Sequence, residues 1–274
     1  MTRAELINNI CKKNSFLCVG LDPDLKKIPS HLSKLEDPIF EFNKMIIDAT
    51  ADFCVAFKPN LAFYEAYGIS GYISLDKTVK YIREHYPQQF IIADAKRGDI
   101  GNTSTMYAKA FFEQLNADAV TIAPYMGADS VKPFLEFEGK WAVVLALTSN
   151  AGSADFQQIT VEGAQKLYTK VIEDCLKWGN KNNTMFVAGA TKPQMLAGIR
   201  SQVPDHFLLV PGVGAQGGNL ADVCKAALNK DTGLLVNASR SIIYASAGTD
   251  FAEKARTEAE KTAIEMKQLL NTLL

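Results

Sequence analysis

Eight short apolar segments recur along the 274-residue chain, with segments of helical character between them. They are FLCVGLD (16–22), FCVAFK (53–58), FIIADAK (90–96), AVTIAP (119–124), AVVLALT (142–148), MFVAGA (185–190), FLLVPG (207–212) and LLVNAS (234–239). Their apolar residues are nearly continuous rather than alternating, which is typical of parallel strands covered on both faces. Eight such strands alternating with helices predict a (β/α)₈ (TIM) barrel. A doubly wound open sheet is the alternative, because sequence alone does not show whether a sheet closes.

The segments between the apolar runs carry helical signals. Thr2 and Glu5 have the spacing of a capping box at the start of a first helix. Further segments that are amphipathic or end at a helix-stop glycine are 74–86, 130–137, 163–179 and 251–274. No low-complexity linker or change of composition divides the chain, so we expect residues 1–274 to form a single domain.

Composition excludes several classes of function. The formal net charge of −1 gives no basic surface for nucleic acid or an anionic membrane. The first 14 residues lack the apolar stretch of a signal peptide, and no apolar run reaches membrane-spanning length. The five scattered cysteines and three isolated histidines have neither CxxC nor zinc-motif spacing. We therefore expect a cytoplasmic protein with reduced thiols and without a transition-metal site built by its own residues.

The segment DAKRGD (94–99) places two acids and a lysine directly behind an apolar run. Charges at the end of a buried strand are costly unless they are paired, so the segment marks either a structural ion cluster or a site that uses charge. Alternation along a strand places Asp94 and Lys96 on one side, with Ala95 facing the helices. The embedded RGD tripeptide also occurs in cell-adhesion sequences, but it recurs by chance and nothing else here looks extracellular.

Polar residues also follow other predicted strands. In (β/α)₈ barrels the active site forms where the carboxyl ends of the strands meet the following loops. The polar residues at those ends are Asp22, Lys58, Asp94 with Lys96, Thr148 with Ser149, and 237–240. Gly98 permits a turn that returns Asp99 toward this group. Two acids and two lysines in one pocket hold one another in fixed protonation states and positions, which provides preorganised charge.

The segment PGVGAQGG (211–218) contains a GxGxxG pattern after the seventh predicted strand. A dinucleotide fingerprint would normally lie in a first βα unit, with an acid about 20 residues further on. The loops after strands seven and eight of a barrel commonly bind phosphate through backbone N–H groups. We therefore expect a phosphate site, to which Gln216 and Arg240 add donors. The structural alternative is that the glycines only form a tight turn and that Arg240 is a surface charge.

These motifs together resemble those of the orotidine 5′-phosphate decarboxylase family. The segments that carry the resemblance are VGLDPD (19–24), AFKPN (56–60), DAKRGDIGNT (94–103), PGVGAQGG (211–218) and NASRSIIYA (237–245). The match is to the bacterial branch, whose DxKxxD motif continues as IGNT, and it runs from the first predicted strand to the eighth. DxKxxD alone is shared with related phosphosugar decarboxylases and synthases, whereas the full set is specific.

The resemblance implies a homodimeric barrel that converts orotidine 5′-monophosphate to uridine 5′-monophosphate (UMP) and CO₂ without a metal or organic cofactor. Lys96 would be the general acid that protonates C6 as CO₂ leaves. Asp94 would lie against the substrate carboxylate and Lys58 would belong to the charged network. Asp99 would complete the network from the other subunit, and Thr103 would cross the interface with it.

The resemblance also assigns substrate contacts. Asp22 would bind a ribose hydroxyl, Ser149 the pyrimidine edge, and Gln216 and Arg240 the phosphate. This chain has Ala151 where the family usually has proline after TSN, which leaves the conformation of that loop and the contact of Ser149 open.

Three other functions fit parts of the pattern. A phosphosugar decarboxylase or aldol-type synthase with the same DxKxxD barrel would use Mg²⁺ to stabilise an enediolate. A Schiff-base aldolase would use Lys58 or Lys96, but a lysine between acids stays protonated and is a poor nucleophile. A non-catalytic nucleotide-phosphate binder would need a broken charge cluster, yet Lys58, Asp94, Lys96 and Asp99 are all present.

Overall fold

The computed structural model describes residues 1–190, 192–213 and 218–274. Its eight parallel strands follow one another in sequence order around a closed barrel, and the last strand pairs with the first. The strands are β1 (Leu17–Leu21), β2 (Ala56–Pro59), β3 (Phe90–Arg97), β4 (Ala119–Ile122), β5 (Trp141–Leu147), β6 (Thr184–Ala188), β7 (Phe207–Pro211) and β8 (Leu234–Ala238). Closure confirms the (β/α)₈ barrel and excludes the open-sheet alternative.

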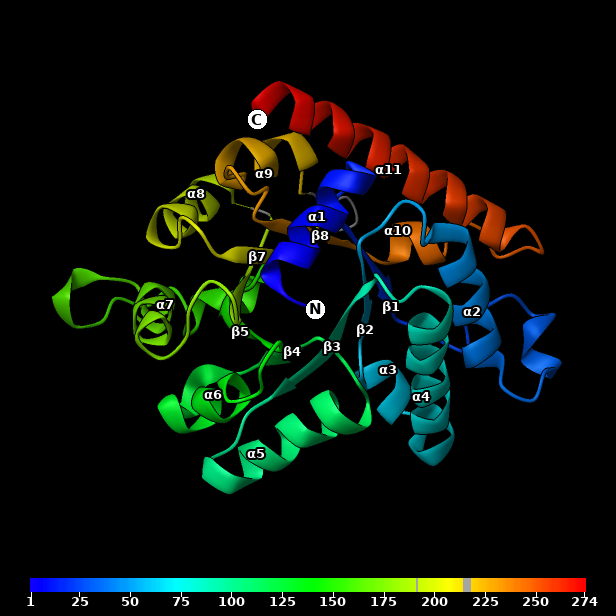
Figure 1. Ribbon diagram of the computed structural model, residues 1–274, viewed down its shortest axis with the longest axis horizontal. Coiled ribbons are helices and arrows are strands. Elements are labelled where there is room, and N and C mark those ends of the chain that lie inside the picture. The colour runs from blue at the N-terminus through cyan, green and yellow to red at the C-terminus, as the bar shows by residue number, and fades with distance from the viewer. Residues whose placement is uncertain (191, 214–217) are drawn as a thin grey trace.

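The α-helices surround the barrel (Figure 1). They are α1 (Arg3–Lys13), α2 (Pro38–Thr50), α3 (Ala62–Glu65), α4 (Gly68–His85), α5 (Gly101–Lys109), α6 (Ala128–Leu135), α7 (Leu167–Trp178), α8 (Pro193–Gln202), α9 (Leu220–Ala227), α10 (Arg240–Ile243) and α11 (Phe251–Leu273). Short 3₁₀ or π segments are η1 (Leu32–Lys34), η2 (Ala110–Gln114), η3 (Pro124–Met126), η4 (Ala151–Ala154) and η5 (Glu162–Ala164). Along the described ranges, no helix is long and apolar enough to cross a membrane.

The predicted helix signals correspond to observed helices, with shifted boundaries: α4 begins at Gly68, six residues before the expected segment 74–86. The capping box of α1 is present, since Glu5 N–H donates to Thr2 Oγ1 and Thr2 N–H donates to Glu5 Oε2 at 2.7 Å. Helix α7 begins at Leu167, later than the amphipathic pattern that starts at Gly163. Gly163 has φ 79° inside the η5 turn, and this left-handed residue prevents the helix from starting there.

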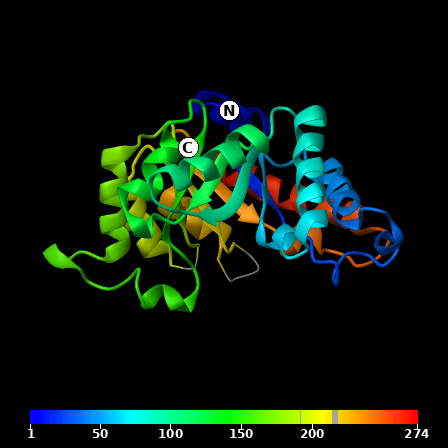
Figure 2. The same ribbon diagram turned by 90° about the horizontal axis from the view of Figure 1, so that it is seen from below.

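Helix α1 lies across the amino-terminal end of the barrel, over its centre in Figure 1. The Met1 amino group pairs with Asp118 at 2.8 Å, just before β4, and Trp141 Nε1 at the start of β5 donates to the Met1 carbonyl oxygen. Arg3 pairs with Asp231 at 3.0 Å, before β8. Figure 2 shows the amino terminus at one edge of the molecule and the segment that follows β5 at the opposite edge. The barrel therefore opens toward the carboxyl ends of its strands.

Candidate active site

A cluster of opposite charges lies at the carboxyl ends of β2 and β3. Lys58 Nζ lies 2.7 Å from Asp94 Oδ2, and Lys96 Nζ lies 2.6 Å from Asp94 Oδ1. Thr121 on β4 donates its hydroxyl to Asp94 Oδ1 at 2.8 Å. The side chains of Lys58 and Asp94 are 5% and 10% exposed, whereas that of Lys96 is 50% exposed. One lysine and the acid are therefore fixed in the barrel, and the second lysine reaches toward solvent.

The cluster fixes the ionisation of its buried members. Burial alone would raise the pKa of Asp94, but the charges of Lys58 and Lys96 outweigh it and hold that pKa well below its ordinary value. Burial would lower the pKa of Lys58, but the carboxylates of Asp94 and Asp22 outweigh it and raise that pKa. Asp94 and Lys58 therefore remain charged across the physiological pH range, and Asp94 presents a permanent anion to Lys96.

A cavity of about 430 Å³ opens beside this cluster. Its polar lining comes from the ends of several strands, while apolar residues of the barrel interior form the rest of its wall. The lining residues are Lys58, Asp94, Lys96, Thr121, Leu145, Thr148, Ser149, Asn150, Val187, Leu209, Pro211 and Asn237. The cavity thus combines apolar surface for a planar ring with charged and amide groups that can orient it.

Asp22 directly follows β1, and its carboxylate lies close enough to Lys58 to raise the pKa of that lysine. Its Oδ2 accepts a hydrogen bond from Ser239 Oγ at 2.7 Å. Its Oδ1 is buried and has no hydrogen-bond partner. Gly20 makes the close approach of β1 and Ser239 possible, because a Cβ at Gly20 would lie 2.7 Å from the Ser239 Cβ. Asp22 therefore offers an unused acceptor near the charged cluster, as a ribose-binding residue would.

Ser149 lines the cavity in the loop after β5. Gly189 at the end of β6 packs directly on it, since a Cβ at Gly189 would lie 2.8 Å from Ser149 N and 3.0 Å from Ser149 Cβ. The preceding Thr148 N–H donates to Gln157 Oε1 at 2.8 Å. Ala151 begins the 3₁₀ turn η4, so the chain turns at this position without the usual proline.

Asp99 and Thr103 lie at the start of α5, away from the cluster. Asp99 Oδ1 accepts from Ile100 N–H at 2.7 Å, and Ser104 Oγ donates to the Asp99 carbonyl oxygen at 2.7 Å. Within the part of the chain that the structure describes, no ion pair joins Asp99 to Lys58 or Lys96, and Thr103 is exposed. A single chain therefore does not bring these two residues into the site.

The predicted phosphate loop is described at both ends. Gly212 has φ 95°, which favours glycine, and a Cβ at Gly218 would lie 2.9 Å from the Gly212 carbonyl oxygen. Arg240 begins α10 and is exposed. Gln216 lies outside the described residues.

The sequence of the chain matches proteins of one family. A model of the orotidine 5′-phosphate decarboxylase / HUMPS family matches residues 15–255. An orotidine 5′-phosphate decarboxylase of Flavobacterium johnsoniae is 62% identical over 272 residues, with 99% of each chain covered. One of Phocaeicola vulgatus is 58% identical over 270 residues, covering 98% of this chain and 99% of the relative. The chain belongs to this family.

Solved structures of family members agree with this assignment. Leishmania donovani OMP decarboxylase superposes with a TM-score of 0.85 at 35% identity, covering 98% of this chain and 99% of the other. Leishmania donovani UMP synthase gives the same TM-score at 37% identity. The match covers 96% of this chain but only 55% of the longer UMP synthase chain. The barrel architecture is thus that of OMP decarboxylases.

Sequence reasoning missed side chains that hold the charged residues in place. Thr121 contacts both Asp94 Oδ1 and the Lys96 backbone N–H. Ser239 belongs to the predicted polar run 237–240, but its contact with Asp22 was not predicted. Thr121 is the one polar residue of the run AVTIA (119–123), and a lone hydroxyl among inward-facing apolar residues was a usable signal. Gln157 had no such signal, because it lies in a loop whose path depends on the rest of the fold.

Proposed function

We propose that this protein catalyses the decarboxylation of orotidine 5′-monophosphate to UMP and CO₂ in de novo pyrimidine biosynthesis. The observation that carries the proposal is the Lys58–Asp94–Lys96 cluster at the edge of a cavity in a barrel of this family. Relatives named for this activity extend over almost the whole chain at 62% and 58% identity. The reaction belongs to the carboxy-lyases.

Lys96 performs the central step of the proposed mechanism. When the bond between C6 and the carboxylate breaks, CO₂ leaves and the electron pair stays on C6, where no adjacent π system delocalises it. The Lys96 ammonium supplies the opposite charge and then its proton, forming the C6–H bond and leaving a neutral amine that solvent reprotonates. Asp94 keeps Lys96 positioned at 2.6 Å, and Lys58 holds Asp94 from the other side.

The remaining predicted residues would hold the substrate. The unused buried Oδ1 of Asp22 suits a ribose hydroxyl, and Ser149 on the cavity wall suits the pyrimidine edge. Arg240 and Gln216 are proposed to bind the phosphate. Arg240 is exposed at the end of β8, where an incoming phosphate would replace solvent.

We further propose a homodimer in which Asp99 and Thr103 enter the partner's site. Asp99 lies outside its own cluster, and the surface beside it exposes large apolar side chains, among them Ile100, Met106 and Tyr125. A dimer would cover this surface and add a carboxylate next to Lys96.

Subunit mixing tests the shared site. Lys96→Ala and Asp99→Ala dimers, each inactive alone, should regain about a quarter of wild-type activity after subunit exchange, because half of the random dimers then contain one intact site. Mixing Lys96→Ala with Asp94→Ala is the matched control and should regain no activity. Lys96 and Asp94 of one site come from the same chain, so each site of a mixed dimer lacks one of the two. Equal recovery in both mixtures, or in neither, would contradict the shared site.

The activity itself is tested by following the ultraviolet absorbance of orotidine 5′-monophosphate with purified protein and EDTA. Loss of absorbance in EDTA supports the proposed reaction, whereas an EDTA-sensitive activity on sugar phosphates would favour the Mg²⁺-dependent enzymes. Borohydride trapping with a sugar phosphate would reveal a Schiff-base aldolase. UMP binding without decarboxylation would indicate a non-catalytic binder.

We also propose that the protein acts in the cytoplasm and that residues 1–274 form one domain. All five cysteines are free thiols, and all except Cys11 are buried, as expected where disulfides do not form. The final helix α11 packs against α2, since the ring of Phe251 stacks on that of Phe42 with centroids 5.3 Å apart.

A further inference from the structure

Strand β3 is irregular at the point where it carries the charged cluster. It pairs with β4 at Ala93↔Val120 and next at Arg97↔Ile122. The three residues 94–96 of β3 therefore lie opposite a single residue of β4, Thr121. Within this bulge Lys96 has φ 48°, in the left-handed region that residues with a side chain rarely adopt. Such a bulge leaves backbone N–H and C=O groups without their ladder partners.

Side chains replace the missing ladder bonds. The Lys96 N–H donates to Thr121 Oγ1 at 3.0 Å, and the Arg97 guanidinium donates to the Ala95 carbonyl oxygen at 2.7 Å. Regular pairing resumes directly afterwards, where Ala123 N–H donates to the Arg97 carbonyl oxygen at 2.8 Å. Thr121 thus holds the bulge from the side of β4, and Arg97 holds it from the helix side.

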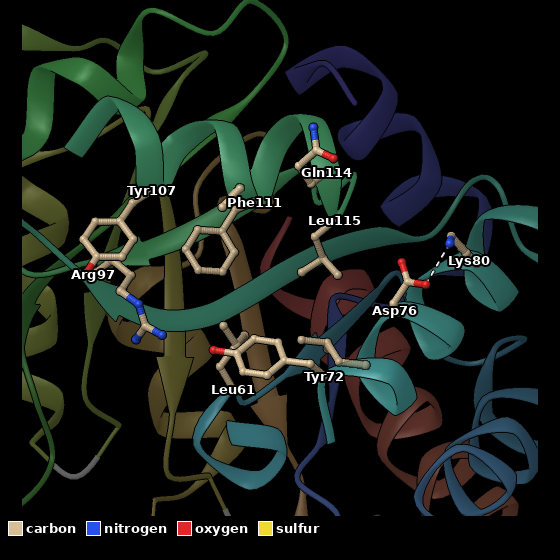
Figure 3. A pocket seen from close by; sticks show the side chains of 11 residues that line it. Leu61, Tyr72, Asp76, Lys80, Arg97, Tyr107, Phe111, Gln114 and Leu115 are labelled. Atoms are coloured by element: carbon tan, nitrogen blue, oxygen red, sulfur yellow. Dashed lines mark hydrogen bonds and ion pairs between the residues drawn. The ribbon is translucent and has the colours of Figure 1, made fainter. Parts of the chain in front are cut away.

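Arg97 is itself fixed by its surroundings. Its guanidinium forms an ion pair with Glu65 at the end of α3 and lies over the rings of Tyr107 and Phe111, 5.7 and 5.9 Å from their centroids. Arg97, Tyr107 and Phe111 line a cavity of about 470 Å³ between α4 and the segment α5–η2, into which Arg97 extends (Figure 3). A planar guanidinium can donate to a carboxylate and to a carbonyl oxygen in fixed directions, which an ammonium group does not reproduce.

We propose that Arg97 is a positioning residue for decarboxylation: by holding the Ala95 carbonyl, it keeps the β3 bulge in the geometry that aims Lys96 Nζ at the reacting carbon. The inference rests on the proposed role of Lys96 as proton donor. Arg97 lines the outer cavity, whereas Asp94 and Lys96 line the inner one, so it does not touch the substrate. Its loss should slow the chemical step without weakening substrate binding.

The test is Arg97→Met, which keeps a long side chain over the two rings and removes the donors. We expect kcat to fall about 10- to 100-fold, the range that small displacements of a catalytic group produce. KM and the dissociation constant for UMP should change by less than about 2-fold, because binding groups are untouched. Arg97→Lys, which keeps a charge beside Glu65 without the planar fork, should give an intermediate kcat.

Arg83→Met is the matched control, because Arg83 also bonds backbone carbonyl oxygens and a carboxylate, but at the amino-terminal end of the barrel. Both variants should lower the Tm, and only Arg97→Met should lower kcat per folded protein. Wild-type kcat in Arg97→Met, or an equal fall in Arg83→Met, would overturn the inference. If Arg97→Met does not fold, Arg97→Lys tests the inference in its place: its kcat should fall while its KM stays unchanged. Inactive wild-type protein would instead overturn the proposed function and the inference with it.

Discussion

The two ends of the barrel each hold a carboxylate between two cations. At the carboxyl end, Asp94 accepts from Lys58 and Lys96 at 2.7 and 2.6 Å. At the amino end, Asp118 accepts from the Met1 amino group and Arg83, both at 2.8 Å. A cavity of about 430 Å³ borders each cluster. Charge and cavity size therefore do not distinguish the candidate active site from a structural ion cluster.

The partners of the cations distinguish the two ends. Arg83 also donates to the carbonyl oxygens of Asn116 and Gln89, and Asp118 also accepts from the Ile91 N–H. By contrast, the only hydrogen-bond partner of Lys96 Nζ among the described residues is Asp94, and half of its side chain is exposed. An ammonium with one fixed partner and free donors is available to a substrate, whereas saturated cations only stabilise the fold.

The largest expected effect follows from removing the available cation. Lys96→Ala should lower kcat by about 10⁴-fold, because it removes the proton donor and the charge that faces C6. Its Tm should stay close to that of wild type, since the side chain is half exposed. Lys140→Ala is the matched control at the other end, where Nζ donates to the Ala117 carbonyl oxygen at 2.7 Å. A comparable loss of kcat in Lys140→Ala would break the distinction between the two ends.

Removing the carboxylate at the amino end should affect stability instead. Asp118→Asn leaves two cations beside a neutral amide at a site that is 5% exposed, which should cost about 3 kcal/mol of unfolding free energy. The kcat of the folded variant should equal that of wild type. Denaturant unfolding and steady-state kinetics measure the two quantities. Asp231→Asn, which affects a more exposed pair with Arg3, should cost less than about 1 kcal/mol. Lost activity in a stably folded Asp118→Asn would contradict the comparison.

The sequence predicted the barrel and the cluster because both depend on local patterns. Continuous apolar runs identify parallel strands, and motif spacing placed Lys58, Asp94 and Lys96 at strand ends. The reasoning about geometry was only partly right. Asp94 and Lys96 do lie together, but a bulge with a left-handed Lys96 replaces regular alternation. A glycine is required at position 98, because a Cβ there would lie 2.6 Å from the Ala123 carbonyl oxygen.

Other features were not predictable, because they depend on contacts between segments that are distant in sequence. The ion pair of Arg97 with Glu65 and the contact of Gly189 with Ser149 form only after the barrel closes. The same holds for the cluster around Asp118, whose partners come from residues 1 and 83. The roles of Asp99 and Thr103 remain predictions, since they require a second chain.

The smallest expected effect concerns acid stability and sharpens the comparison further. His206 lies before β7, at the amino end, and both its ring nitrogens are buried without hydrogen-bond partners. Burial and the charges of Arg200 and Arg3 lower its pKa to about 4, although Asp205 opposes them. The unfolded chain therefore binds a proton between pH 6.5 and 4 that the folded chain does not, so stability falls as pH falls through this window, by about 1–3 kcal/mol.

His206→Phe should remove this loss, because a phenyl ring does not titrate and fits beside Phe186, whose ring centroid lies 5.8 Å from that of the imidazole. Urea unfolding at a series of pH values should show wild type and variant diverging below pH 6.5. His85→Phe, a change at an exposed position on α4, controls for the loss of an imidazole and should keep the wild-type profile. If the unfolding free energies of His206→Phe and wild type fall in parallel as the pH falls, the acid sensitivity does not originate at the amino end of the barrel. The charges of Asp94 and Lys58 persist throughout this range, so acid should weaken the closed end of the barrel before it neutralises the cluster at the open end.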